Sequence, residues 1–152
     1  MHSTVFVFKS KDSDAEYTYS EDDIMEMIKW RGADYTTEEQ ISDDDDLTFL
    51  THHNGTYKNR VLTLTPEETD CARELEEHNI REELNAMLNE GKNASLLDPL
   101  KLYQIKRIAG EDYGCLIIID NNEVMNTREF IACLKHNEEN SFELVQQFDY
   151  HV

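Results

Sequence analysis

Carboxylates are the most abundant potentially functional groups in this sequence, and they are concentrated in its first third. Between Lys11 and Leu50, fourteen acidic residues stand against three basic ones, which leaves eleven net negative charges in this segment. B-form DNA carries about one charge per 1.7 Å of its axis, so carboxylates spread over one face can imitate its phosphates and occupy a basic cleft. The candidate residues for contact with such a partner are Asp12, Asp14, Glu21, Asp22, Asp23, Glu26, Glu38, Glu39, Asp43, Asp44, Asp45 and Asp46.

The charge of the whole chain favours the same kind of partner. The 152 residues include 33 acids and 14 bases, which gives a formal net charge of -19. Solubility of a small domain needs a net charge of only about 2–8. A charge this large repels nucleic acids and anionic membranes. We therefore expect a basic protein partner and no direct binding to nucleic acid or membranes, although a solvated surface is the simpler interpretation of any single acidic run.

A second group that could do chemistry combines the phenol of Tyr57 with the carboxylates of Glu67 and Glu68. These residues flank one predicted strand, and such groups can orient a small ligand or move a proton. Glu67 and Glu68 also have a local structural role, because they lie in the first turn of a predicted helix. The catalytic interpretation therefore depends on whether the fold brings the three side chains together.

The sequence predicts no metal site and no cofactor. His52 and His53 are adjacent on a predicted strand, so their side chains should point to opposite faces. The run Asp43–Asp46 lacks the spacing and the internal glycine of a calcium-binding loop. The five glycines of the chain form no phosphate-binding loop.

The three cysteines, Cys71, Cys115 and Cys133, lie far apart and form no CxxC pair. We expect free thiols in a reducing compartment rather than a disulfide framework. The sequence does not open with a secretory signal of the usual form, and no apolar run reaches the ~20 residues of a membrane span. These features predict a cytoplasmic protein.

Apolar periodicity and turn residues predict the elements that must position these groups. Thr4–Lys9 reads as a strand, and Ser20 caps a helix that Gly32 ends. Residues 33–46 are predicted to form a loop. A hairpin is predicted next, because Asn-Gly suits a type I′ turn. Its arms and turn are Leu47–His53, Asn54–Gly55 and Thr56–Thr65.

The second half of the chain is predicted to hold three helices and two strands. Thr65, Pro66 and Glu68 form a capping box with proline in the first helical position, and this helix should run to about Asn89. Its apolar stripe comprises Ala72, Leu75, Ile80, Leu84, Met87 and Leu88. The remaining elements are a helix over 98–109, a central strand Cys115–Ile119, a helix from Asn126 or Thr127 to His136, and a half-buried strand Phe142–Val152.

The element order predicts a single α+β domain over residues 1–152, with an antiparallel or mixed sheet that helices cover on one face. Its first five elements, a strand, a helix, two strands and a helix, resemble the beginning of a ferredoxin-like split βαβ arrangement with additions.

Two classes of function fit these observations. The first is an interaction protein of the virus-type anti-defence kind, which inhibits a basic nucleic-acid-handling partner by mimicking nucleic acid. An immunity or antitoxin protein is a variant of it with another target. This class predicts that the acids of residues 12–46 form one continuous face with the helix acids of 74–83. The alternative is a small trimeric ferredoxin-like enzyme or ligand-binding domain for a metabolite or nucleotide, with Tyr57, Glu67 and Glu68 at its site.

Overall fold

The computed structural model describes the chain except residues 15, 17, 44, 92–93, 111–113 and 121–122. It has a mixed sheet with the strand order β3-β4-β7-β1-β5-β6, and β2 also pairs with β7. The strands are β1 (His2–Ser10), β2 (Tyr35–Glu39), β3 (Thr56–Lys58), β4 (Val61–Leu64), β5 (Leu116–Ile119), β6 (Met125–Asn126) and β7 (Asn140–His151). The helices are α1 (Glu21–Ile28), α2 (Pro66–Asn89), α3 (Pro99–Ile108) and α4 (Thr127–Cys133), with short 3-10 helices η1 (Lys29–Arg31) and η2 (Leu47–Thr51). The α+β prediction is confirmed.

The centre of the sheet is formed by β1 and its two neighbours. β1 runs antiparallel to β7, from His2 opposite His151 to Ser10 opposite Phe142, and parallel to β5. All four residues of β5 are buried. The prediction of a central strand covered on both sides is therefore confirmed, and it follows from an apolar run without alternation.

Helices cover both faces of the sheet, so the expectation of a single covered face is wrong. Successive residues of β1 point to opposite faces. Val5 and Val7 pack with Ile24 and Ile28 of α1. Phe6 and Phe8 face the other way and pack with residues of η2, α4 and the first half of α2. Because β1 is apolar on both sides, each side needs its own cover.

One split βαβ unit is present. β1 and β2 are both antiparallel to β7, so they are parallel to each other with β7 between them. The chain passes through α1 between these two strands. On its other side, however, β1 pairs with β5, and β5 in turn pairs with β6. The complete ferredoxin-like arrangement is not confirmed.

The predicted hairpin around Asn54–Gly55 is wrong. Leu47–Thr51 forms a 3-10 helix because Leu47 and Leu50, three residues apart, are both buried on one side. The hairpin turn lies instead at Asn59 and Arg60, whose φ angles of 51° and 63° suit a type I′ turn between β3 and β4.

The predicted loop over 33–46 contains a strand. β2 pairs with the C-terminal half of β7, from Tyr35 opposite His151 to Glu39 opposite Gln147. Only Thr36 of its five residues is buried. The polar sequence of β2 hides it from pattern analysis, since an exposed edge strand needs few apolar residues.

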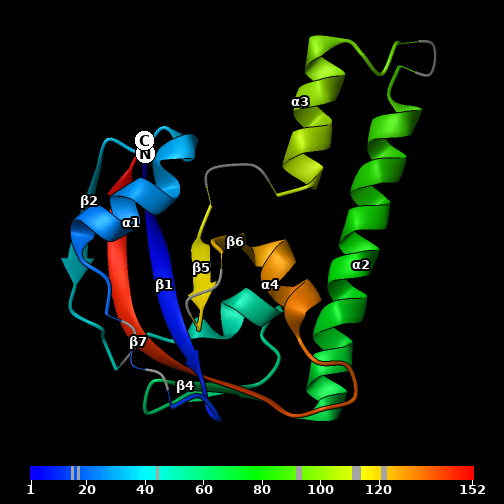
Figure 1. Cartoon of the computed structure of the whole chain (residues 1–152). Coiled ribbons are helices and arrows are strands. Elements are labelled where there is room, and N and C mark those ends of the chain that lie inside the picture. The colour runs from blue at the N-terminus through cyan, green and yellow to red at the C-terminus, as the bar shows by residue number, and fades with distance from the viewer. Residues whose placement is uncertain (15, 17, 44, 92–93, 111–113, 121–122) are drawn as a thin grey trace.

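The helix starts are where they were predicted. Thr65 and Glu68 form the capping box of α2 with proline in its first turn, and Asn126 caps α4. The end of α2 and all of α3 form a helical pair that projects from the sheet (Figure 1). Among the described residues, no helix is both long enough and apolar enough to cross a membrane.

Candidate functional site

The acids singled out in the sequence are exposed and lie on α1, on β2 and on the segments that flank them. We call the acidic edge the eleven residues Asp12, Asp14, Glu21, Asp22, Asp23, Glu26, Glu38, Glu39, Asp43, Asp45 and Asp46, all of which are exposed. Asp44 lies outside the described residues. Six of these acids are on α1 and β2, which lie on the side of the sheet away from α2 and α3 (Figure 1). Asp46, in contrast, caps η2 on the face that carries Phe8, and Asp12 lines a cavity with Cys133 of α4. The acidic edge is therefore open to a large partner.

Hydrogen bonds tie α1 and β2 together within the acidic edge. Thr36 Oγ1 donates to the Glu21 carbonyl at 2.8 Å, and the Glu38 backbone N–H donates to Glu21 Oε1 at 2.9 Å. Gln146 Nε2, from β7, donates to Glu38 Oε1 at 2.9 Å. Two carboxylates on different elements are thus held in fixed relative positions by neutral donors, which leave their negative charge uncancelled.

Two further acids of the edge, Glu39 and Asp43, are held by side chains of β7 and of the β3–β4 turn. Gln147 Nε2 donates to Glu39 Oε2 at 2.9 Å. Arg60, in the β3–β4 turn, forms an ion pair with Asp43 at 2.7 Å. The hydrogen bond from Arg60 to Asp43 raises the pKa of this guanidinium.

Two acids of the edge accept backbone hydrogen bonds at helix N-termini. The Ser20 backbone N–H donates to Asp23 at 2.8 Å and lowers the pKa of its carboxyl. The Thr48 backbone N–H does the same for Asp46, also at 2.8 Å. Both carboxylates are ionised throughout the neutral range, as an N-terminal helix position favours.

The acids of α2 do not continue this surface. α1 packs on the face of the sheet that carries Val5, whereas α2 packs on the face that carries Phe8. The exposed acids Glu74, Glu77 and Glu82 of α2 therefore point away from the acidic edge. The expectation of one continuous face over residues 12–46 and 74–83 is wrong.

The structure does not assemble Tyr57, Glu67 and Glu68 into a site. Tyr57 packs against the core cluster around Phe8, and burial raises the pKa of its phenol. Its charged neighbours are Arg60, Asp43, Asp45 and Asp46. Glu68 belongs to the capping box of α2. None of the three cavities that can be described is lined by any of these three residues.

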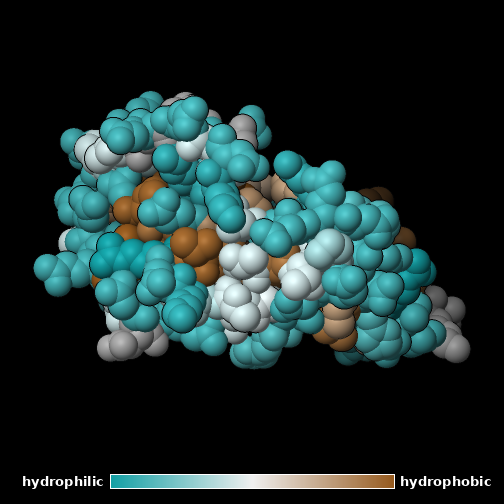
Figure 2. All heavy atoms as spheres, turned by 90° about the horizontal axis from the view of Figure 1, so that it is seen from below, coloured by the Kyte–Doolittle hydropathy of each residue, from teal (hydrophilic) through white to brown (hydrophobic). Residues whose placement is uncertain are grey.

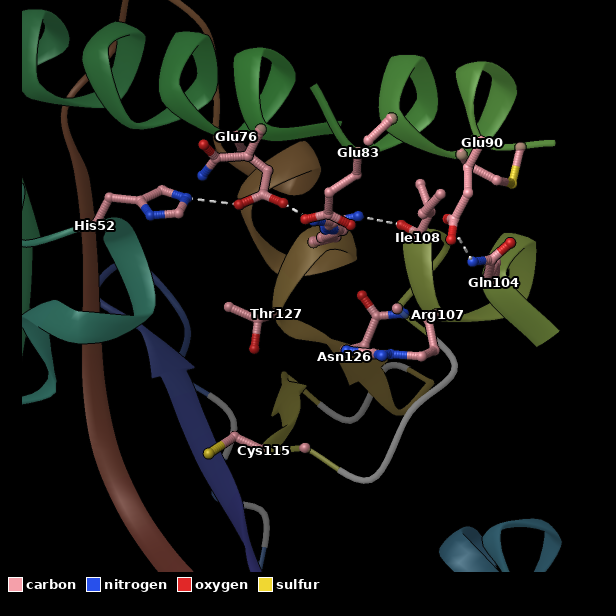
Figure 3. A pocket seen from close by; sticks show the side chains of 16 residues that line it. His52, Glu76, Glu83, Glu90, Gln104, Arg107, Ile108, Cys115, Asn126 and Thr127 are labelled. Carbon is pink, nitrogen blue, oxygen red and sulfur yellow. Dashed lines mark hydrogen bonds and ion pairs between the residues drawn. The ribbon is translucent and has the colours of Figure 1, made fainter. Parts of the chain in front are cut away.

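A polar cavity of about 500 Å³ lies where α2 and α3 meet α4 (Figure 3). At its wall, Glu76 of α2 is only 7% exposed. His52 Nε2 lies 2.5 Å from Glu76 Oε2, and Arg128 Nε lies 2.5 Å from Glu76 Oε1. Arg128 also reaches Glu83 at 2.7 Å and donates to the Ile108 carbonyl. The cluster joins η2, α2, α3 and α4 around one buried carboxylate.

Sequence reasoning missed this cluster because it did not expect a glutamate among the buried positions of α2, although Ala72 and Met87 of the predicted stripe are buried. Leu75 was placed in the apolar stripe but is 40% exposed, and its neighbour Glu76 is buried. The buried positions of α2 are Thr69, Ala72, Glu76 and Met87. Their spacings of three, four and eleven residues fit a helical period. A pattern search that accepts only apolar residues as buried therefore misses Glu76.

The backbone at His52 is held in an uncommon conformation. Its φ is 56°, and the backbone N–H closes η2 by donating to the Phe49 carbonyl. A non-glycine residue in this region costs about 1 kcal/mol and persists where the surroundings impose it. Here the contact of His52 with Glu76 is one of the interactions that impose it.

Across the cavity, burial raises the pKa of Cys115, so its thiol stays protonated and is a poor nucleophile.

The chain was compared with protein-family models, curated proteins and solved structures, and no match was found in any of the three.

Proposed function

We propose that this protein binds a basic, nucleic-acid-handling protein through its acidic edge and blocks the site where that partner holds nucleic acid. The observation that carries the proposal is the exposure of all eleven described acids of the edge, six of which lie together on α1 and β2. Nucleic-acid sites are lined with lysine and arginine, so a fixed array of carboxylates can compete for them.

Two physical effects favour such a complex. The net charge of -19 attracts a basic protein over long distances and speeds association. The hydrogen bonds to Glu21, Glu38 and Glu39 position three carboxylates before any partner arrives, which reduces the entropy lost on binding. Because the acids of α2 point elsewhere, the proposed contact surface is confined to the acidic edge. The proposal implies that the protein is a virus-type inhibitor and that it acts in the cytoplasm.

The test compares two variants with the same change in net charge. Asp14→Asn, Asp22→Asn and Glu26→Gln neutralise three acids of the edge, whereas Glu67→Gln, Glu74→Gln and Glu82→Gln neutralise three exposed acids of α2. Each variant is immobilised and used for affinity capture from a lysate of the cells in which the protein occurs, at low and at high salt.

We expect the wild type and the α2 variant to retain the same basic protein, which elutes as salt rises. The edge variant should bind it about tenfold more weakly, since exposed charge pairs contribute about 0.5 kcal/mol each. Equal weakening by both variants would show that only net charge matters and would contradict the proposal. So would a captured protein that has no basic surface.

A second candidate function is binding of a small polar molecule in the cavity beside Glu76. A volume of about 500 Å³ is typical of a ligand site. In addition, the side-chain carbonyl of Gln104 is buried there without a hydrogen-bond partner among the described residues. The probes are nucleosides and amino acids in a thermal-shift assay, and Ala86→Phe serves to fill the cavity. A shift in the wild type that disappears in Ala86→Phe supports this function, whereas an identical shift in both proteins contradicts it.

A further inference from the structure

The cavity of about 500 Å³ beside Glu76 is lined by more charged groups than the cluster around that carboxylate. Its acids are Glu76, Glu83 and Glu90 of α2, and its bases are Arg107 of α3 and Arg128 of α4. The face of the molecule in Figure 2 is mostly hydrophilic, and charges on such a surface are solvated individually. Charges that face one cavity can instead act on the same bound molecule. The pairing of these five charges therefore indicates what the cavity can bind.

Three of the five charges are engaged with one another. Arg128 forms ion pairs with Glu76 at 2.5 Å and with Glu83 at 2.7 Å. The same guanidinium donates to the Ile108 carbonyl. These contacts join α2, α3 and α4, so a ligand that used them would replace interactions that the protein already makes.

The other two charges are not paired within the described part of the chain. The guanidinium of Arg107 has no hydrogen bond or ion pair there. The carboxylate of Glu90 meets a neutral group, the side-chain amide of Gln104, at 3.4 Å. Arg107 and Glu90 form no ion pair with each other, although their helices α3 and α2 pack side by side. Within the part of the chain that is described, the cavity thus offers one cation and one anion to a ligand.

The positions of these two groups suit a short ligand. Arg107 follows Gln104 by three residues, so the two lie on one face of α3, about 4.5 Å apart along its axis. Because Glu90 contacts Gln104, the available cation and anion lie about one turn of α3 apart. The same cavity is lined by apolar side chains of both helices, Met87 and Ile108. A ligand that fits has two opposite charges close together and an apolar part.

We infer that the cavity binds an α-amino acid with an apolar side chain, an inference that rests on the second candidate function. The carboxylate of the ligand pairs with Arg107, whose planar guanidinium can donate two parallel hydrogen bonds to it. The ammonium group of the ligand pairs with Glu90, and its side chain packs on Met87 and Ile108. Because both charges of the ligand are matched, it enters without leaving an unpaired charge in the cavity.

The experiment measures binding of L-leucine and L-methionine to the full chain by isothermal titration calorimetry. Two analogues of leucine each lack one charge, since leucinamide has no carboxylate and isocaproate has no ammonium group. We expect each analogue to bind about tenfold more weakly than leucine, because it loses a charge-assisted hydrogen bond. Either analogue binding as tightly as leucine would overturn the inference.

Matched variants locate the site on the protein. Arg107→Gln should weaken binding of leucine about tenfold. Arg81→Gln should leave it unchanged, because Arg81 is an exposed residue of α2 that does not line the cavity. Glu90→Gln, with the exposed Glu82→Gln as its control, tests the ammonium contact in the same way. Cavity variants that bind leucine as their controls do would contradict the assigned contacts.

The second candidate function can survive a failure of this inference. If neither amino acid binds while the thermal shift caused by a nucleoside disappears in Ala86→Phe, the cavity is a ligand site for another class of molecule and the inference is wrong. If no probe binds, both the inference and the second candidate function are wrong. Neither result bears on capture of a basic partner by the acidic edge.

Discussion

The acidic edge and the distal hairpin, which is formed by the second half of α2 and all of α3, are both exposed, but they are anchored to the sheet in different ways. Under the edge, α1 buries Ile24 and Ile28 completely, and β2 buries Thr36. The hairpin buries Met87 and the stem of Lys101 and is held at its base by the cluster around Glu76. The edge is a charged surface on a packed scaffold, whereas the hairpin is an apolar surface on a scaffold with little packing. The two regions should therefore respond differently to the loss of an apolar side chain.

The largest effect on stability is expected where the hairpin meets the body. Arg128→Met leaves the buried carboxylate of Glu76 without its main cation, and removal of one partner from a buried pair costs about 3–5 kcal/mol. Both side chains are well shielded, with 19% and 9% exposed. The free energy of unfolding from urea titration measures the loss. The control is Arg81→Met, which removes an exposed pair with Glu77 and should cost at most about 0.5 kcal/mol. Equal costs would contradict the role given to Glu76.

The next effect contrasts the packing of the two regions. Ile28→Ala, under the acidic edge, should cost about 2–5 kcal/mol because it opens a cavity in a fully buried site. Leu100→Ala should change the free energy of unfolding by about 0.5 kcal/mol or less in dilute protein, since Leu100 is 63% exposed. A large cost at Leu100 in the monomer would show that the hairpin has a core of its own.

A smaller effect concerns acid stability at the edge. The pKa values of Asp23 and Asp46 are lowered from 3.8 by backbone hydrogen bonds from Ser20 and Thr48. Their contribution is therefore fully present above pH 3.8 and is lost as pH falls through the lower folded values. Asp46→Asn keeps an N-cap but removes the titration, so its Tm should fall less steeply than that of the wild type between about pH 4 and pH 2. Parallel curves would contradict the assigned hydrogen bond to Thr48.

The smallest effect is kinetic and reports on the base of the hairpin. Cys71 and Cys133 are exposed, while Cys115 is half-buried at the cavity and has a raised pKa. A thiol reagent at mildly alkaline pH should modify two cysteines rapidly and the third slowly. Arg128→Met should accelerate the slow phase by loosening the cavity wall. Equal modification rates for all three cysteines in the wild type would contradict the shielding of Cys115 at the cavity.

The parts of the fold that sequence could predict depend on neighbours along the chain. The capping box at Thr65, the helix start at Asn126 and the apolar strand predicted over Cys115–Ile119 are each encoded within a few residues, and all three are confirmed. β2 depends on β7, more than a hundred residues away, so its polar sequence carried no local signal. The Asn54–Gly55 prediction failed because burial of Leu47 and Leu50 favoured a helical turn instead.

The candidate sites show the same limit. The acids of the edge were identifiable because exposure is the default state of a carboxylate. The arrangement of these acids could not be identified, because the faces that α1 and α2 cover depend on how the whole sheet is assembled. The Glu76 cluster draws His52 and Arg128 from positions 24 and 52 residues away. No local pattern indicates that pairing, and only the assembled fold places the three side chains together.

The most direct test of the central claim is competition with duplex DNA for the captured basic partner. The acidic edge is proposed to occupy the nucleic-acid site, so DNA should displace the wild-type protein completely. The variant with Asp14→Asn, Asp22→Asn and Glu26→Gln should be displaced at about tenfold lower DNA concentration. A ternary complex that contains the partner, the protein and DNA together would contradict the account.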